Sequence, residues 1–153
     1  MEIRIVSGTI DHLPDCKEAL RNSQLGEVYY TSDEILTSRL AEGMTKGEIH
    51  VALDENNQCL GYIWIALRGA FYDFPYCRSL AVRKDCRGRG VGTALLEYYE
   101  KVGFAKAARI FMLVSDFNER ARKLYESLGY RQVGLMPDLF KEGVAEFILM
   151  KAK

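Results

Sequence analysis

Hydrophobic and polar positions change period several times along the chain. The stretch Ile3–Val6 has the two-residue alternation of a short strand. Between about Asp11 and Tyr29, apolar residues recur at helical spacing and predict one helix. A second helix is expected to begin at Thr31, in a T-S-D-E stretch typical of a capping box, and to end at Gly43 or Gly47.

The middle of the chain changes to the period of a strand. Ile49–Leu53 alternates, the turn-forming letters DENN follow, and LGYIWIAL runs from Leu60 to Leu67, which predicts a hairpin. Because its second strand is apolar on both faces, we expect that strand to lie centrally in a sheet. After a loop, Tyr76–Val82 predicts a further strand.

The last part of the chain alternates helices with strands. A long helix is expected from about Gly90 to about Gly103, with an apolar stripe formed by Val91, Ala94, Leu95, Tyr98 and Val102. The elements expected after it are the strand Arg109–Ser115, the helix Asn118–Leu128 closed by Gly129, and the strands Tyr130–Leu135 and Val144–Lys151. No repeat or linker interrupts the pattern, so the sequence predicts one mixed α/β domain over residues 1–153.

Composition excludes several classes of protein. The chain has 153 residues and no formal net charge, so no global field favours nucleic acid or an acidic membrane, and one short RGRG run is no basic footprint. No apolar window reaches the length of a membrane span and no secretory leader is recognisable, so we expect a cytoplasmic protein. The cysteines lack metal-site spacing; we expect no metal, and mostly buried free thiols at Cys16, Cys59, Cys77 and Cys86.

The stretch CRGRGVGTALL, Cys86–Leu96, joins the end of a strand to the start of a helix. A helix N-terminus has unpaired N–H groups and a partial positive charge, and glycines let an anion approach the backbone. Arg87 and Arg89 add forked donors. The combination predicts a phosphate or pyrophosphate site, and a tight turn into a packed helix is the alternative. P-loop and dinucleotide signatures fit poorly, because no lysine follows Gly92 and the glycine spacing differs.

The segment LAVRKDCRGRGVGTALL resembles the signature of the GNAT superfamily of acyl-CoA-dependent N-acyltransferases, R/Q-x-x-G-x-G/A after a strand, with Arg87, Gly90 and Gly92 in its three defining positions. A second segment, NERARKLYESLGYRQVG, resembles the family's N-x-x-A-x-x-L-Y-x-x-x-G-F/Y motif. The resemblance covers roughly Glu48–Lys151. It implies a single GNAT-like domain with a central, mixed but mostly antiparallel sheet of about six to seven strands, flanked by about four helices and splayed at the acyl-CoA cleft.

The resemblance also implies acetyl-CoA as the co-substrate. In the family the CoA pyrophosphate lies on the glycine loop and the helix start, and the preceding strand pairs with the pantetheine arm. The residues that correspond here are Arg87, Gly88, Arg89, Gly90, Val91, Gly92 and Thr93 for the pyrophosphate, and Leu80, Ala81 and Val82 for the pantetheine arm. The N–H of Val82 is expected to meet the negative charge that develops on the thioester carbonyl oxygen.

Two residues of the second motif are candidates for the reaction itself. Tyr125 matches the family's general acid, which protonates the departing thiolate. Its spacing on an amphipathic helix also fits an ordinary core aromatic. Asn118 matches a residue that contacts the pantetheine arm, and it also stands where a helix N-cap is expected.

The general base and the acceptor site are less defined. Many relatives carry a glutamate on the strand before the glycine loop, but YCRSLAV has none. Glu48, His50 and Asp73 are candidates that would act through ordered water, and a solvated surface role is the alternative for each. The stretch GEVYYTSDE and the stretch FYDF are acidic and aromatic, so Tyr29, Tyr30 and Asp73 are candidates for binding a cationic amine. Helix-cap acids and core aromatics would produce the same pattern.

Two functions therefore remain open. The first is an N-acetyltransferase that moves an acetyl group from acetyl-CoA to a primary amine, of a small molecule or a peptide, by direct attack through a tetrahedral intermediate. The second is a non-catalytic acyl-CoA sensor or partner subunit of the same fold. The missing strand carboxylate slightly favours the second function, and Tyr125 at the position of the general acid favours the first more. In the first case the partners of the protein would be acetyl-CoA and an amine acceptor. The resemblance allows a homodimer in either case.

Overall fold

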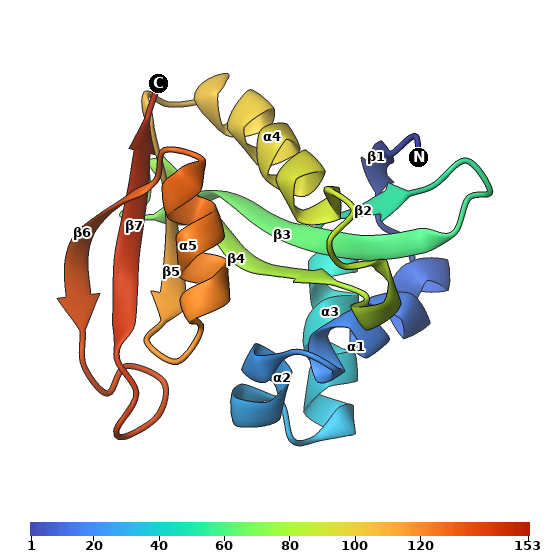
Figure 1. Ribbon diagram of the computed structural model, residues 1–153, viewed down its shortest axis with the longest axis horizontal. Coiled ribbons are helices and arrows are strands. Elements are labelled where there is room, and N and C mark those ends of the chain that lie inside the picture. The colour runs from blue at the N-terminus through green and yellow to red at the C-terminus, as the bar shows by residue number, and fades with distance from the viewer. The chain divides into compact units, whose positions relative to one another are not determined.

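Seven strands are hydrogen-bonded into one mixed sheet in the computed structural model, which describes all residues from 1 to 153 (Figure 1). Their order in the sheet is β1-β2-β3-β4-β5-β7-β6. The strands are β1 Arg4–Ser7, β2 Ile49–Leu53, β3 Cys59–Ala70, β4 Phe74–Val82, β5 Arg109–Ser115, β6 Arg131–Met136 and β7 Glu146–Ala152. Neighbours pair antiparallel at β1–β2, β2–β3, β5–β7 and β6–β7, and β4 pairs with β5 in parallel. The mixed, mostly antiparallel sheet expected from the sequence is therefore confirmed.

Five α-helices and two short 3-10 turns complete the chain. The helices are α1 Leu13–Arg21, α2 Gln24–Tyr29, α3 Asp33–Thr45, α4 Val91–Phe104 and α5 Glu119–Ser127, and the turns are Ile10–His12 and Lys84–Cys86. No helix is long and apolar enough to cross a bilayer. None of the four cysteines forms a disulfide and all four are buried, as predicted.

The chain divides into two compact units whose boundaries fall inside β3 and inside β4. The first unit comprises Met1–Ile65 and Ser79–Lys101, and the second comprises Ala66–Arg78 and Val102–Lys153. The alternating residues of β2 form the centre of the core in the first unit, where they pack with residues of α1, α3 and β3. The members of that core with at most 2% exposure are Cys16, Ala19, Leu20, Leu36, Leu40, Ile49, Val51, Cys59 and Tyr62.

The single helix predicted from Asp11 to Tyr29 is wrong, because the chain breaks between α1 and α2. The Ser23 hydroxyl accepts a hydrogen bond from the Gly26 N–H at 3.0 Å and caps a new helix. Gly26 also lies close to α1: a Cβ placed on it would be 2.0 Å from the Leu20 carbonyl oxygen. The glycine thus permits a sharp turn that the hydrophobic spacing alone did not indicate.

The residue that caps the start of α3 also differs from the prediction. Ser32, and not Thr31, is the N-cap, and its hydroxyl accepts a hydrogen bond from the Ile35 N–H at 3.3 Å. At the other end, Gly47 has a φ of +71° and follows the last turn of α3. Gly43 is buried within the helix, so Gly47 is the glycine that ends it.

In the α4 helix, the buried stripe is turned by about one residue from the predicted one. The side chains with at most 2% exposure are those of Val91, Leu95, Leu96 and Tyr99. Ala94, Tyr98 and Val102, which the pattern had assigned to the core, are half-buried. Tyr98 and Tyr99 are adjacent tyrosines, so the residue type does not indicate which of the two faces the core.

The second unit is built on a regular antiparallel pairing. The β5 strand pairs with β7 over its whole length, from Arg109 with Ala152 to Ser115 with Glu146. The α5 helix lies against this pair in Figure 1, and the Arg122 guanidinium stacks over the Phe147 ring at 4.8 Å. Gly129, with a φ of +97°, ends α5 as predicted.

Candidate functional site

The loop between β4 and α4 has the backbone geometry of an anion site. Gly88 and Gly90 have φ angles of +76° and +81°, which residues other than glycine rarely adopt. A Cβ built on either residue would meet nothing within 4 Å, so the space above the loop is open. The Gly90 carbonyl accepts the first helical hydrogen bond of α4, from the Ala94 N–H at 3.0 Å. The N–H groups at the start of α4, from Val91 on, therefore have no partner within the helix.

The side chain of Arg87 supports this loop from within. Its Nε donates to the Val82 carbonyl at 3.2 Å, and an Nη donates to the Asn22 carbonyl at 2.9 Å. The guanidinium thus ties the loop to the end of β4 and to the segment after α1. Arg89, by contrast, is exposed on the loop. Of the two arginines proposed to add charge, Arg89 is the one whose side chain is directed into solvent.

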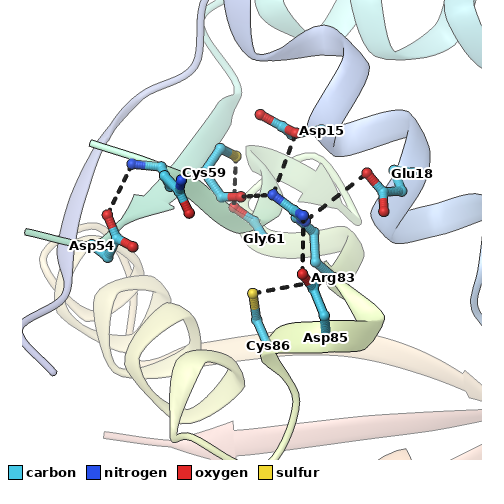
Figure 2. Close-up of polar contacts among 9 residues, drawn as sticks. Asp15, Glu18, Asp54, Cys59, Gly61, Arg83, Asp85 and Cys86 are labelled. Carbon is cyan, nitrogen blue, oxygen red and sulfur yellow. Dashed lines mark hydrogen bonds and ion pairs between the residues drawn. The ribbon is translucent and has the colours of Figure 1, made fainter. Parts of the chain in front are cut away.

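Arg83 is a second arginine that supports the end of β4, and the sequence did not identify it as a functional residue (Figure 2). Its guanidinium lies 3.6 Å from the Asp15 carboxylate, 4.0 Å from Glu18 and 3.1 Å from Asp85. Burial lowers the pKa of Arg83, but Asp85, Glu18 and Asp15 outweigh that effect and raise the pKa overall. The cluster connects the end of β4 to α1. Its sequence signal was a lone arginine next to a short acidic turn, which is too common to be specific.

The end of β4 also lies unusually close to β3. The Arg83 N–H donates to the Leu60 carbonyl at 2.8 Å. A Cβ on Gly61 would be 2.6 Å from the Ala81 carbonyl oxygen and 3.0 Å from the Val82 Cα. Gly61 therefore sets the close spacing between β3 and the part of β4 that carries two of the residues assigned to the pantetheine arm. Leu80 and Val82 are half-buried and Ala81 is buried.

Two of the candidate bases lie in the first unit. The Glu48 carboxylate accepts a hydrogen bond from the Trp64 indole N–H at 3.1 Å. The His50 ring is tilted against Tyr98, with ring centroids 4.9 Å apart, and its Nδ1 is buried without a hydrogen-bond partner. Burial lowers the pKa of His50, so the ring is neutral at pH 7. A neutral imidazole can accept a proton, and the Glu48 carboxylate keeps lone pairs that the Trp64 hydrogen bond does not use.

Tyr125 is buried on α5 in the second unit, with 9% of its surface exposed. Burial, and to a lesser extent Cys77, raise the pKa of its phenol far above the neutral range. Its ring meets Tyr130 edge to face, with centroids 6.3 Å apart. The phenol is therefore protonated at neutral pH, which is the state that a proton donor needs.

Asn118 stands at the N-cap position of α5, but its side chain makes no capping hydrogen bond. Its backbone N–H donates to the Ser115 carbonyl at 2.9 Å, and its carbonyl accepts from the Arg122 N–H at 3.1 Å. Asn118 is therefore the N-cap residue of α5, as the alternative predicts, but its amide side chain does not cap the helix.

The residues predicted for the acceptor site come from both units: Tyr29 and Tyr30 belong to the first and Asp73 to the second. Tyr29 and Tyr30 lie at the end of α2, and Tyr30 packs against the core of the first unit. Asp73 is exposed in the turn before β4. Because β4 and β5 are parallel, that turn lies at the amino end of β5, whereas Asn118 follows its carboxyl end. The structure therefore does not bring Asp73 and Asn118 together.

Comparison with known proteins identifies the family. Residues 14–130 match the Acetyltransferase (GNAT) family. The chain belongs to this family. Over 77 residues, this GNAT protein is 40% identical to an uncharacterized N-acetyltransferase of Methanocaldococcus jannaschii, and the alignment covers 49% of each chain. Over 103 residues it is 28% identical to the N-alpha-acetyltransferase RimI of Mycobacterium tuberculosis, which covers 67% of this chain and 64% of RimI. The chain thus spans about half to two thirds of the length of these two relatives.

Solved structures of the same fold extend over the whole GNAT chain. The PaiA N-acetyltransferase of Thermoplasma acidophilum, in complex with coenzyme A, has a TM-score of 0.75 at 17% identity and covers 100% of both chains. An acetyltransferase of the GNAT family from Bacillus cereus has a TM-score of 0.79 at 18% identity. At these identities the likeness establishes the fold. No group of three or more His, Cys, Asp or Glu side chains is placed to hold a metal ion in this GNAT chain.

Proposed function

We propose that this GNAT protein binds acetyl-CoA and transfers the acetyl group to a primary amine. The observation that carries the proposal is the loop after β4, where Gly88 and Gly90 open the backbone at the start of α4. A coenzyme A pyrophosphate fits such a loop, because unpaired N–H groups and an adjacent arginine offer donors to a doubly charged anion. Membership of the GNAT family and the coenzyme A complex of PaiA support the same ligand.

When bound, acetyl-CoA supplies an activated thioester. The backbone of Arg87–Thr93 would hold its pyrophosphate, with Arg89 as the free charge, and the backbone of Leu80–Val82 would hold the pantetheine arm, assisted by Asn118. The Val82 N–H would stabilise negative charge on the acyl oxygen. Tyr125, protonated at neutral pH, would donate its proton to the departing sulfur.

The acceptor amine must lose a proton, and β4 carries no carboxylate to take it. His50 and Glu48 are the two candidates in the first unit: the His50 ring has a lowered pKa, and the Glu48 carboxylate keeps lone pairs besides its hydrogen bond from Trp64. For the acceptor itself we keep the proposal of a cationic amine bound by aromatic and acidic side chains, with Tyr29, Tyr30 and Asp73 as candidates. A panel of amines tests it: equal rates for cationic and neutral amino compounds would contradict this part of the proposal.

The first experiment is a calorimetric titration with acetyl-CoA. Wild-type protein should bind one equivalent, and Gly90→Asp should lose at least about a hundredfold in affinity, because it adds a negative charge and a side chain where the pyrophosphate would lie. Gly47→Asp is the matched control. Gly47 also has a positive φ, +71°, and open space around it, so it carries the same backbone cost away from the loop. Equal affinity in both variants would move the site elsewhere.

The second experiment separates catalysis from binding. Thiol release is followed with an amine panel for the wild type and for Tyr125→Phe. We expect the variant to lose about a hundredfold in kcat while its acetyl-CoA affinity stays within a few fold, because only the phenolic proton is removed. Unchanged turnover would remove Tyr125 from the mechanism. Tight acetyl-CoA binding with no thiol release from the wild type would favour the non-catalytic acyl-CoA sensor, the alternative suggested by the missing carboxylate on β4.

A further inference from the structure

Glu146 is a buried carboxyl residue that the proposed mechanism does not use. It is the first residue of β7 and only 3% of its surface is exposed. Its Oε2 accepts a hydrogen bond from the Ser115 hydroxyl at 2.7 Å, and the two residues are direct partners in the β5–β7 pairing. A carboxyl group is costly to bury, and an apolar pair would fill the same space without that cost. The position therefore calls for an explanation beyond packing.

The hydrogen bond lies at the point where β5 passes into α5. Only three residues, numbers 116–118, separate the end of β5 from the start of α5. On these residues, the Asp116 N–H donates to the Ala145 carbonyl at 2.9 Å, and the Ala145 N–H donates to the Asp116 carboxylate at 3.0 Å. We call the four residues Ser115, Asp116, Ala145 and Glu146 the β5–α5 lock.

The lock has one buried and one exposed part. The Asp116 side of it is exposed, so water competes for its hydrogen bonds. The hydrogen bond between Ser115 and Glu146 is buried, so water does not compete for it. Glu146 is therefore the member of the lock that fixes the turn most firmly.

The α5 helix depends on such a support. It has only nine residues, and a helix of that length is marginal without tertiary contacts. Its N-cap residue, Asn118, makes no side-chain capping bond, so the usual local device for fixing a helix start is not used. The Asn118 N–H instead donates to the carbonyl of Ser115, whose hydroxyl is held by Glu146.

We propose that Glu146 is a positioning residue for acetyl transfer: through Ser115 it fixes the β5–α5 turn, and thereby the positions of Asn118 and Tyr125. The inference rests on the proposed function, in which these two residues contact the cofactor and protonate the leaving thiolate. A small displacement of a proton donor is enough to lower the rate strongly, because catalysis depends on the geometry of the reacting groups.

The experiment compares Glu146→Ala with Glu146→Gln. The glutamine keeps an oxygen that can accept a hydrogen bond from the Ser115 hydroxyl, and the alanine has no such oxygen. For the folded fraction we expect Glu146→Ala to lose at least about tenfold in kcat, with the acetyl-CoA dissociation constant within about threefold of the wild type. Glu146→Gln should keep kcat within about threefold. If Glu146→Ala does not fold, Ser115→Ala takes its place and should show the same loss of kcat.

A second readout tests the lock without turnover. In Glu146→Ala or Ser115→Ala, hydrogen exchange of the Asn118 and Arg122 amides, which are hydrogen-bonded at this turn, should accelerate at least about tenfold, while Glu146→Gln stays near the wild type. The control is Glu126→Ala, an exposed glutamate of α5 that pairs with Arg122 and should change neither readout appreciably.

Three results would overturn the inference. These are an unchanged kcat in the folded alanine variant, an unchanged exchange rate of the Asn118 and Arg122 amides, or a glutamine variant as impaired as the alanine variant, which would make the charge itself the active feature. If the wild type binds acetyl-CoA but releases no thiol with any amine, the proposed acetyl transfer fails. The exchange rates would then still decide whether Glu146 holds the turn.

Discussion

At the scale of single residues, His50 shows how burial changes the chemistry of a side chain. Its Nδ1 is enclosed without a hydrogen-bond partner, beside the ring of Tyr98. Burial lowers the pKa of His50 in the folded protein below its ordinary value of 6.5. The unfolded chain therefore binds the proton more tightly than the folded one, and the stability linked to His50 is present above about pH 6.5 and is lost as the pH falls below it.

This linkage gives a measurable pH dependence. The free energy of unfolding of the wild type should decrease between pH 7.5 and pH 5, and His50→Gln should show a shallower decrease, because glutamine takes up no proton. Urea unfolding followed by Trp64 fluorescence at several pH values measures both. Parallel curves for the two proteins would show that His50 does not contribute.

The sequence identified the residues of the glycine loop but not how each one acts. Glycines at 88 and 90 were predicted to open the backbone, and their positive φ angles and open surroundings agree with that reason. The sequence predicts the same role for the charges of Arg87 and Arg89, yet Arg87 donates to two backbone carbonyls. Which arginine faces solvent depends on contacts with Asn22, a residue 65 positions away, and no local pattern contains that information.

At the scale of elements, periodicity located the strands and helices but not every boundary. The sequence predicts the strands around residues 49–53, 109–115 and 146–152, because their residues are apolar on both faces or alternate between apolar and polar. The break between α1 and α2 was missed, since Ser23 and Gly26 act through a cap and a close approach rather than through hydrophobic spacing. Predicted elements were thus most accurate where burial alone decides.

The approach of β3 to β4 gives a prediction at this scale. Gly61→Ala should lower the free energy of unfolding by about 2 kcal/mol, because the new methyl group collides with the backbone of Ala81 and Val82 rather than with a side chain that can move. It should also weaken acetyl-CoA binding. Gly47→Ala, which meets nothing within 4 Å but strains a positive φ, should cost only about 1 kcal/mol. Urea unfolding measures both, and equal costs would contradict the assigned role of Gly61.

At the scale of the whole molecule, the two compact units share continuous strands. The boundary in β3 lies between Ile65 and Ala66, and the boundary in β4 lies between Arg78 and Ser79. A strand that is folded on one side of such a boundary favours the extended backbone on the other. We therefore propose that residues 1–153 fold as one domain, as the sequence predicts.

A single cooperative transition is the expected outcome. Trp64, the one tryptophan, reports on the first unit, and far-ultraviolet circular dichroism reports on the whole chain. The two transitions in urea should coincide. Glu146→Gln and Glu126→Ala, both in the second unit, should shift the Trp64 transition only as far as they shift the circular dichroism. Separate midpoints for the two probes would show that the units unfold independently.

The sequence alone is enough to infer the class of fold, the order of most elements and the family, because hydrophobic period and the two motif spacings are local properties of each segment. The tertiary structure decided which of these residues serve as support and which remain available. It placed Arg83 among three carboxylates of α1 and the loop, lowered the pKa of His50 by burial, and set Glu146 against Ser115. These properties arise from pairs of residues that are distant in the chain, and only the packing of β-strands and helices brings such pairs into contact.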